Sequence, residues 1–334
     1  MSALEILEVG PGVTVQDSGR PGYLGEGVSR GGAADRLALA EGAALLKQPV
    51  GAALEMAGLG GRFRFGRAAR IALTGAPMRA TLDGVVLRWN ASHTVPDGAV
   101  LEIGGVTQGV YGYLTVGGGI DLPLILGAMS AHLAAGISGP LQAGDRIALK
   151  DDAGGVSGLG LAVSDRFEGG TLRVLPSLQT DVFPKHMRDR FETDHFTRDT
   201  RGNRMGVRLK PSSEGYGLEA GGRILSEVIT PGDIQIPGDG APYILLGECQ
   251  TTGGYPRIGT VIPADLPRVA QAAPGANLRF RFVSREEALA AEGAYRTGLD
   301  RLRAQVAPLV RDPHDINLLA YDLVSGVTDG EVMR

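Results

Sequence analysis

Glycine is the residue that most constrains how this chain can fold. The 334 residues include 52 glycines and 19 prolines, and these are scattered among Val, Ile and Leu rather than gathered in one segment. Clustered glycine and proline are typical of disordered segments, whereas scattered ones interrupt apolar runs at short intervals. The pattern therefore predicts many short strands joined by tight turns.

Strand-like segments outnumber helical ones. Residues 62–66 (RFRFG) and 278–283 (LRFRFV) alternate between charged and apolar side chains, which is the period of a half-buried strand. Further segments of this kind are 70–75, 99–105, 112–118, 145–149, 171–176 and 233–237. Two helices are expected, one after Asp35 as N-cap and one after Ser284, where SREE is a capping box. We therefore expect a mainly β fold with a few short helices and a C-terminal helix.

The chain divides at the glycine-rich stretch DDAGGVSGLG, residues 151–160, which shows no periodicity. The predicted units are an N-terminal β module over 1–152, a linker over 153–165, a second β module over 166–284, and a C-terminal helix with an apolar docking tail over 285–334. Both modules end in strand, turn, strand. This likeness indicates either an internal duplication or the general similarity of glycine-rich β segments.

Composition excludes several classes of function. A net charge of −4 argues against nucleic acid or an acidic membrane surface as the main partner. No apolar run approaches the ~20 residues of a membrane span, and MSALEILEVGPG lacks the regions of a signal peptide, so we expect a cytoplasmic protein. The single cysteine, Cys249, cannot form an internal disulfide or a cysteine metal cage, and the five histidines lack metal-ligand spacing. We therefore expect no metal site.

Standard catalytic motifs are absent from the sequence. There is no GxxxxGK[ST] loop for nucleotide phosphates, no GxGxxG between a strand and a helix, and no GxSxG nucleophile turn. Cys249 has no histidine near it in the sequence. Any enzymatic role must therefore rest on hydrogen-bonding and charged groups around a β scaffold, with another chain completing the site where needed.

Two polar clusters interrupt the apolar pattern early in the chain. In TVQDSGRPGY, residues 14–23, an amide, a carboxylate and a guanidinium follow a strand as Gln16, Asp17 and Arg20. They either line a cleft or only pin the turn through an Asp17–Arg20 ion pair. In VSRGGAAD, residues 28–35, Ser29 and Asp35 flank a Gly-Gly turn, and Asp35 is more simply explained as a helix cap.

Two further clusters lie in the second half. In RGNRMGVRL, residues 201–209, arginines suited to carboxylate or phosphate oxygens stand beside Asn203. In YILLGECQTTGGYPRIG, residues 243–259, a buried strand runs directly into amides and hydroxyls, although a hairpin needs only Gly or Asn-Gly at its tip. The amide and hydroxyls of residues 250–252 match the donors and acceptor of a urea, lactam or ureido ring. Alternatively, these side chains only satisfy buried carbonyls at the strand end.

These clusters supply the predicted site. We expect Gly253 and Gly254 to admit a flat ligand and Tyr255 to stack on it. The predicted catalytic residues are Gln250, Arg204 and Asp17, with Arg204 stabilising the oxyanion that develops on an amide. The predicted substrate-binding residues are Gln16, Arg20, Asn203, Gln235, Thr251, Thr252 and Tyr255.

Several motifs together carry a family resemblance. PGVTVQDSGRPGYLGEGVSRGGAAD, NRMGVRL, the block over residues 226–282 and YDLVSG resemble, in this order, the bacterial family of 5-oxoprolinase C subunits. That family is also named allophanate hydrolase subunit 2 and antagonist of a sporulation-kinase inhibitor. The chain is similar as well to the second half of the carboxyltransferase region of urea carboxylase. The chain departs from the family pattern at RGGAAD, at GAMSA (residues 127–131) and at Cys249. Because the first-half motifs are eroded while the second-half motifs are intact, the second module is the safer place for a site.

The resemblance implies a fold of two cyclophilin-like β-barrel modules. It also implies two partners of the 5-oxoprolinase, a kinase-inhibitor-like B subunit together with an A subunit. The implied assembly uses ATP to open 5-oxoproline to L-glutamate. A first alternative is a carboxyltransferase subunit that moves a carboxyl group from carboxybiotin to urea or a related amide. A second alternative is a non-catalytic regulatory partner of a kinase-inhibitor-like protein.

Overall fold

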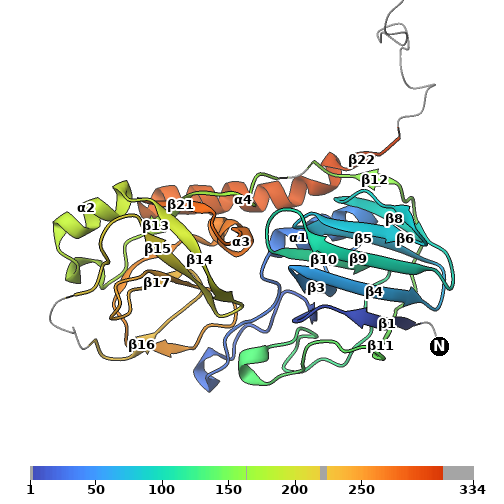
Figure 1. The fold of residues 1–334 in the computed structure, drawn as a ribbon, viewed down its shortest axis with the longest axis horizontal. Coiled ribbons are helices and arrows are strands. Elements are labelled where there is room, and N and C mark those ends of the chain that lie inside the picture. Colours follow the sequence, from blue (N-terminus) through green and yellow to red (C-terminus); the bar gives the residue numbers. More distant parts are fainter. Residues whose placement is uncertain (1–2, 163, 219–223, 311–334) are drawn as a thin grey trace, which may run out of the picture.

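The computed structural model describes residues 3–162, 164–218 and 224–310, which form two β modules beneath a long C-terminal helix (Figure 1). The fold is mainly β with few helices, as predicted. Of the predicted helix and docking tail, residues 311–334 lie outside the described residues. No helix in the described ranges is long and apolar enough to cross a membrane.

The first module consists of two sheets that share one core. The six-stranded sheet has the order β11-β1-β4-β9-β6-β7, and the seven-stranded sheet has the order β2-β3-β10-β5-β8-β12-β22. Leu4, Phe63 and Leu101 of the first sheet are buried against Leu54 and Leu114 of the second. The strands are β1 (Ala3–Val9), β2 (Thr14–Gln16), β3 (Ala53–Ala57), β4 (Leu59–Phe65), β5 (Ala69–Gly75), β6 (Met78–Leu82), β7 (Val85–Val86), β8 (Ala91–Val95), β9 (Val100–Val106), β10 (Tyr111–Val116), β11 (Arg146–Ala148), β12 (Leu159–Gly160) and β22 (Ala307–Pro308).

The alternating sequence of β4 explains how its sheet divides core from solvent. Phe63 and Phe65 are fully buried, while Arg62 and Arg64 lie on the opposite face and form ion pairs with glutamates of neighbouring strands. Side chains of a strand alternate between its two faces, so this one segment supplies both the core and the solvated surface. The prediction from residues 62–66 is confirmed.

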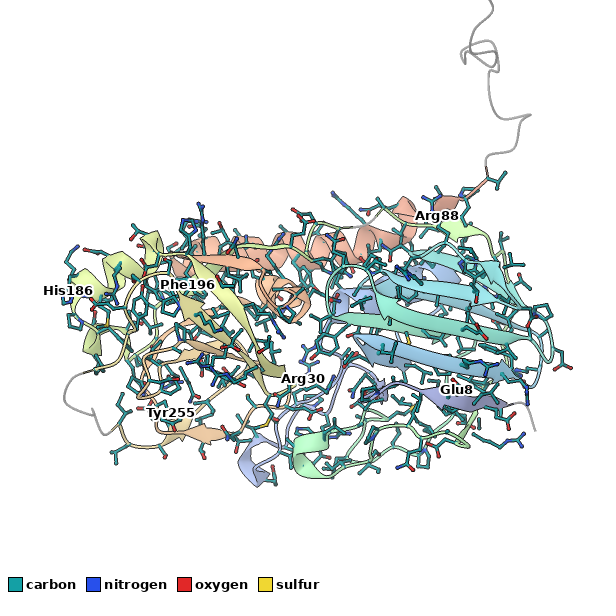
Figure 2. All side chains as sticks on the ribbon, viewed as in Figure 1. Glu8, Arg30, Arg88, His186, Phe196 and Tyr255 are labelled. Carbon is teal, nitrogen blue, oxygen red and sulfur yellow. The ribbon has the colours of Figure 1, made fainter. Side chains whose placement is uncertain are left out.

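The second module is a closed barrel with the strand order β13-β20-β17-β18-β15-β14-β21. Its core is aromatic, with the rings of Phe191 and Phe280 stacked at 4.4 Å between centroids, and Phe196 is seen inside the module in Figure 2. The strands are β13 (Gly169–Leu175), β14 (Phe196–Asn203), β15 (Gly206–Pro211), β17 (Asp233–Gln235), β18 (Tyr243–Leu245), β20 (Arg257–Val261) and β21 (Asn277–Phe282). A separate two-stranded sheet pairs β16 (Glu227–Val228) with β19 (Thr252–Gly253).

Helices connect and cover these sheets. They are α1 (Arg36–Leu46), α2 (Lys185–Thr193), α3 (Leu266–Gln271) and α4 (Arg285–Gln305), with short 3-10 turns η1 (Leu24–Glu26), η2 (Leu133–Ala135), η3 (Thr180–Val182) and η4 (Pro263–Asp265). Both predicted caps are present, since Asp35 accepts from the Ala38 N–H and Ser284 accepts from the Glu287 N–H. Helix α4 extends over both modules (Figure 1), and Leu302 packs with Leu45 and Leu159 of the first module.

The chain therefore returns to its first half at the end of α4. Residues Ala307 and Pro308 form β22, which pairs with β12. Strand β12 falls inside the predicted linker of residues 153–165 and also pairs with β8 through Gly160 and Ala91. The boundaries of the modules stay a prediction.

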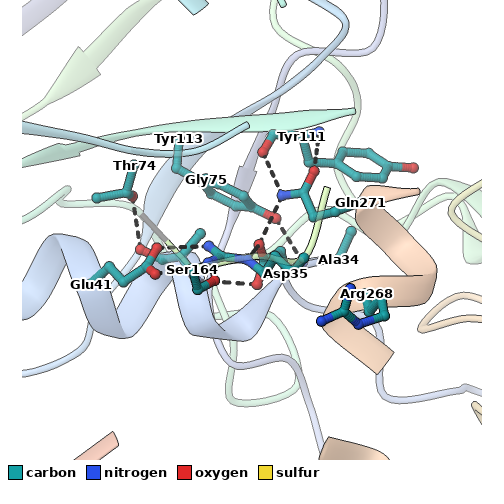
Figure 3. A network of polar contacts seen from close by, with 12 residues as sticks. Ala34, Asp35, Glu41, Thr74, Gly75, Tyr111, Tyr113, Ser164, Arg268 and Gln271 are labelled. Atoms are coloured by element: carbon teal, nitrogen blue, oxygen red, sulfur yellow. Dashed lines mark hydrogen bonds and ion pairs between the residues drawn. The ribbon is translucent and has the colours of Figure 1, made fainter. Parts of the chain in front are cut away.

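A buried polar network joins the two modules (Figure 3). Arg166 donates to Asp35 at 2.7 Å and to both carboxylate oxygens of Glu41 at 2.9 and 2.7 Å. The Gln271 amide, from α3, donates to Asp35 and to the Tyr111 carbonyl, each at 2.8 Å. Asp35 thus caps α1 and also receives two donors from the second half of the chain. Each buried charged side chain in this network has a partner of opposite sign. These ion pairs offset the free-energy cost of burying the charges at the interface.

Candidate functional site

A cavity of about 510 Å³ lies where the modules meet. Segments far apart in the sequence line it. From the first module these are Gly27, Ser29, His132, Ala134 and Ala135, and from the second Met205, Ser226, Gln235, Glu248, Cys249, Gln250, Thr251, Thr252, Gly253, Gly254 and Tyr255. A second hollow of about 390 Å³ lies on the six-stranded sheet, but its charged groups Arg62, Glu8 and Glu102 already pair with one another. The first cavity is therefore the better candidate site.

The stretch after β18 supplies one wall of the cavity, and we name Gln250, Thr251, Thr252 and Tyr255 the cavity cluster. The backbone leaves the barrel at Leu245 and is held by bonds such as the Glu248 N–H to the Arg204 carbonyl at 3.0 Å. Among the described residues, no side chain of the cavity cluster has a hydrogen-bond partner. Gln250 and Thr252 are exposed, and Tyr255 is 53% exposed on the lower side of the second module in Figure 2. The amide and hydroxyls are thus available to a ligand rather than used on strand-end carbonyls.

Gln235 of β17 adds a second amide to this wall. Its side chain is only 5% exposed, lines the cavity, and has no hydrogen-bond partner within the described part of the chain. A Cβ atom at Gly253 would lie 2.5 Å from Gln235 Nε2, so glycine at 253 leaves the room that this amide occupies. A buried amide without a partner is unfavourable unless a ligand or water satisfies it.

The opposite wall carries a hydrogen-bonded pair. Ser29 Oγ lies 2.9 Å from His132 Nε2, and Nδ1 of the same ring accepts from the Ala135 N–H at 3.1 Å. Glu248 lies behind, with Oε2 4.0 Å from His132 Nδ1. Burial lowers the pKa of His132, the Glu248 carboxylate opposes that effect, and Arg20 and Arg204 add to it. The ring is therefore neutral near pH 7.

Sequence reasoning missed His132 and Glu248. His132 is one of five histidines scattered along the sequence. Glu248 lies in the polar stretch of residues 243–259 but was not among the predicted site residues. Ser29 and His132 meet within the first module although 103 positions separate them, and docking of the second module adds Glu248. The one available signal was the place of Glu248, an ionisable residue directly after a buried strand.

Arg204 lies behind the cavity rather than in its lining. Its Nε donates to Glu248 at 2.5 Å, and its other two nitrogens donate to the Glu55 carboxylate and the Gly32 carbonyl. Burial disfavours the charged guanidinium, but Glu55 and Glu248 outweigh burial and raise the pKa of Arg204. Because every guanidinium nitrogen is already engaged, the geometry gives Arg204 a structural place and not the oxyanion contact expected from the sequence.

Asn203 also acts through the backbone. Its Oδ1 accepts from the Met205 N–H at 2.8 Å, within the turn between β14 and β15. Asn203 is exposed and is not among the residues lining the cavity, whereas Met205 is. Asn203 Oδ1 thus supports the turn that presents Met205, and a contact of Asn203 with a substrate stays a prediction.

Gln16, Asp17 and Arg20, which we name the loop-anchoring cluster, lie outside the cavity lining as well. Gln16 Nε2 donates to the Ala131 carbonyl at 3.2 Å, Asp17 Oδ2 accepts from the Met129 N–H at 2.7 Å, and Arg20 donates to the Ser130 carbonyl. No ion pair joins Asp17 to Arg20 among the described residues; Asp17 holds the turn instead through its Oδ1, which accepts from the Gly19 N–H at 2.8 Å. The cluster also holds the loop that ends at His132.

Cys249 lines the cavity but is a poor nucleophile. Burial, with a smaller contribution from Asp233, raises the pKa of its thiol to about 12. The thiolate is the reactive form of cysteine, so at neutral pH this side chain remains a protonated, weakly reactive thiol. Within the described ranges, no group of three or more His, Cys, Asp or Glu side chains is arranged to hold a metal ion.

Comparison with known proteins agrees with this architecture. A family model described as "Carboxyltransferase domain, subdomain A and B" matches residues 26–282. The chain is 34% identical over 307 residues to the 5-oxoprolinase C subunit of Haemophilus influenzae, covering 90% of this chain and 97% of that protein. It is also 34% identical over 296 residues to the 5-oxoprolinase C subunit of Escherichia coli, covering 86% of this chain and 94% of that protein.

Solved structures extend the comparison. The crystal structure of TTHA0988 superposes with a TM-score of 0.77 at 30% identity, covering 84% of this chain but only 56% of TTHA0988. The urea amidolyase of Kluyveromyces lactis superposes with a TM-score of 0.79 at 25% identity, covering 93% of this chain and 21% of that enzyme. The match thus spans a part of each longer protein and nearly the whole of the two bacterial subunits. By sequence and by fold, the chain belongs to the family of carboxyltransferase domains, subdomain A and B, together with the 5-oxoprolinase C subunits of H. influenzae and E. coli.

Proposed function

We propose that this chain is the C subunit of an ATP-dependent 5-oxoprolinase, which opens 5-oxoproline to L-glutamate with its A and B subunits. The observation that carries the proposal is the likeness to two 5-oxoprolinase C subunits over nearly their whole length. We place the complex in the cytoplasm. Neither the sequence nor the cavity offers a recognisable nucleotide-phosphate loop, so ATP is used by the complex and is assigned to no residue of this chain.

The cavity suits a small lactam. The ring of 5-oxoproline presents a carbonyl oxygen as acceptor and an N–H group as donor. The side-chain amides of Gln235 and Gln250 each provide one acceptor and two donors, and the hydroxyls of Thr251 and Thr252 adapt to either role. Tyr255 offers an aromatic face at the rim. These groups bind and orient the amide, while the chain depends on its partners for the complete reaction.

Reconstitution tests the proposal. The purified chain, its A and B subunits, and the full mixture are each incubated with ATP and 5-oxoproline, and glutamate is measured. We expect glutamate only from the full mixture. In size-exclusion chromatography at micromolar concentration, we expect this chain to co-elute with the B subunit. Glutamate release by this chain alone, or none by a co-eluting complex, would contradict the assignment.

Carboxyl transfer is the second candidate, favoured by the family description and by the overlap of 93% of this chain with K. lactis urea amidolyase. In that case biotin would be the cofactor and urea or a related amide the acceptor. The free amides of the cavity cluster would then bind a ureido group in place of a lactam. Transfer of labelled carboxyl from carboxybiotin to urea, blocked by avidin and independent of 5-oxoproline, would establish this candidate in place of the first.

A further inference from the structure

Ser29 and His132 form a pair in the cavity wall to which the proposed function assigns no role. Both side chains are buried, and Glu248 of the second module lies behind the imidazole. The three residue types are those of a Ser-His-Glu triad. In such a triad the imidazole Nδ1–H donates to the carboxylate, and Nε2 accepts the serine proton.

The hydrogen bonds of this pair run in the opposite direction. Because the Ala135 N–H donates to Nδ1 at 3.1 Å, that nitrogen carries no proton. A neutral imidazole then holds its proton on Nε2, which donates to Ser29 Oγ across 2.9 Å. Glu248 Oε2 accepts from the Ala134 N–H at 3.1 Å instead of from the ring. In this arrangement His132 cannot remove the Ser29 proton.

The Ser29 hydroxyl consequently keeps its own proton for a different acceptor. Within the described residues, its contact with His132 is its only side-chain hydrogen bond. Ser29 also lines the cavity, across from the amides of Gln235 and Gln250. The geometry points to Ser29 as a hydrogen-bond donor to the carbonyl oxygen of an amide or lactam ligand, and to the oxyanion that develops there, with His132 as its positioning residue. This inference rests on the proposed function for the identity of the ligand.

The charges around His132 favour this arrangement at neutral pH. Arg20, from the loop after β2, and Arg204, from the turn between β14 and β15, face the imidazole as cations, and Glu248 faces it as the anion. A second proton would sit on Nδ1, where it meets the Ala135 N–H. Protonation would therefore break the bond that orients the ring, and the donor geometry would be lost in acid.

A spectroscopic experiment tests the direction of the hydrogen bonds without reference to activity. The chain is labelled with ¹⁵N-histidine, and long-range proton–nitrogen spectra identify the tautomer of each ring. The His132 signals are assigned by their loss in His132→Gln. We expect a neutral ring with its proton on Nε2 at pH 7.5, and a proton on Nδ1 would overturn the inference.

A second experiment compares four variants in the reconstituted complex. Ser29→Ala removes the proposed donor, and we expect kcat/KM for 5-oxoproline to fall on the order of 10²-fold. Ser130→Ala is the matched control, because Ser130 is equally buried, its hydroxyl has no partner among the described residues, and it is absent from the cavity lining. We expect this control to retain full activity. Equal activity of Ser29→Ala and Ser130→Ala would overturn the inference.

Two variants of His132 distinguish the role of its Nδ1 atom from the role of its Nε2 atom. In His132→Asn the amide oxygen still accepts from the Ala135 N–H but the side chain does not reach Ser29, so we expect a loss like that of Ser29→Ala. In His132→Gln the amide nitrogen reaches the Nε2 position, so we expect activity to be largely retained and to be less sensitive to acid. Equal loss of activity in both variants would show that His132 has only a structural role.

If the wild-type complex does not act on 5-oxoproline, the proposed function is rejected. The tautomer of His132 alone then supports or overturns the inferred direction of the hydrogen bonds.

Discussion

The loop-anchoring cluster and the cavity cluster contain similar residues in opposite circumstances. Both follow a strand, and both present an amide beside further polar groups. Gln16 is fully buried and bonded to the backbone of the loop leading to His132, whereas Gln250 is exposed and free of partners among the described residues. One amide therefore stabilises a loop, and the other is available to a ligand.

The difference lies in what faces each strand end. After β2 the chain runs beneath residues 125–131, so its polar groups are used on the carbonyls and N–H groups of that loop. After β18 the backbone pairs with β16, while the side chains of the cavity cluster line the cavity and meet no hydrogen-bond partner among the described residues. Residue type alone does not separate a supporting amide from a binding one, because both roles use the same donors and acceptors.

Arg204 provides the largest expected effect, because it connects Glu248, which lines the cavity, to Glu55 of the first module. Arg204→Met should lower the free energy of unfolding by about 3–5 kcal/mol, since Glu55 and Glu248 would remain buried without their cation. Urea denaturation followed by fluorescence measures the change. Arg62→Met is the matched control, because Arg62 also pairs with two glutamates but on the exposed sheet face, and its midpoint should barely move. Similar urea midpoints for Arg204→Met and Arg62→Met would show that Arg204 does not stabilise the fold.

Gln250→Leu tests the cavity cluster through activity. Leucine approximates the volume of glutamine and deletes its amide, so we expect glutamate formation by the complex to fall about 10²-fold, or roughly 2.7 kcal/mol. The melting temperature should stay near that of the wild type because the amide has no partner in the described structure. Thermal unfolding is measured beside complex activity. A melting temperature several degrees lower, with activity preserved, would show that Gln250 stabilises the fold and does not bind the ligand.

Gln16→Leu makes the same chemical change in the loop-anchoring cluster and should have the reverse result. The Ala131 carbonyl and the Thr14 hydroxyl would lose their donor inside the protein, at a cost of about 1–3 kcal/mol of stability. Activity per folded complex should fall less than in Gln250→Leu. Denaturant midpoints and activities of the two leucine variants are compared side by side. Unchanged stability of Gln16→Leu would break the distinction between the clusters.

The smallest expected effect is a pH dependence of stability centred on His132, which ends the anchored loop and also lines the cavity. Burial lowers the pKa values of His132 and His93 below 6.5. The unfolded chain then binds more protons than the folded one below that pH, so stability present above pH 6.5 is lost as the pH falls through the lowered values. Unfolding midpoints between pH 7.5 and 5 measure this loss, which should be smaller in His132→Asn. An equal loss of stability in the wild type and in His132→Asn would show that titratable groups other than His132 cause the pH dependence.

Much of the fold followed from local pattern. Alternation in residues 62–66 and 278–283 located β4 and β21, and the caps at Asp35 and Ser284 located the starts of α1 and α4. These features depend on neighbours a few residues away, so they are visible in the chain itself. The barrel of the second module is closed, while the strands of the first divide between two sheets, a difference set by pairings between distant strands.

The candidate site was predictable only in part. The stretch 250–255 stood out because its polar residues interrupt an apolar strand, and Gln235, Thr251, Thr252 and Tyr255 do line the cavity with Gln250. Arg204 and Asn203 stood out for the same reason, but neither lines the cavity. A polar residue within an apolar strand indicates a side chain that needs a hydrogen-bond partner. The sequence does not indicate whether that partner is another part of the protein or a ligand.

The sequence by itself determined the mainly β character, the positions of the principal strands and helices, the family, and the stretch that lines the cavity, because each of these rests on periodicity or on contiguous motifs. Only the tertiary structure decided that Ser29, His132 and Glu248 meet, and that the groups around Arg20 and Arg204 face inward as supports. The physical reason is that contacts between residues a hundred positions apart depend on tertiary packing, within the first module for Ser29 and His132 and between the two modules for Glu248. No local pattern in the chain encodes which buried donor will meet which acceptor.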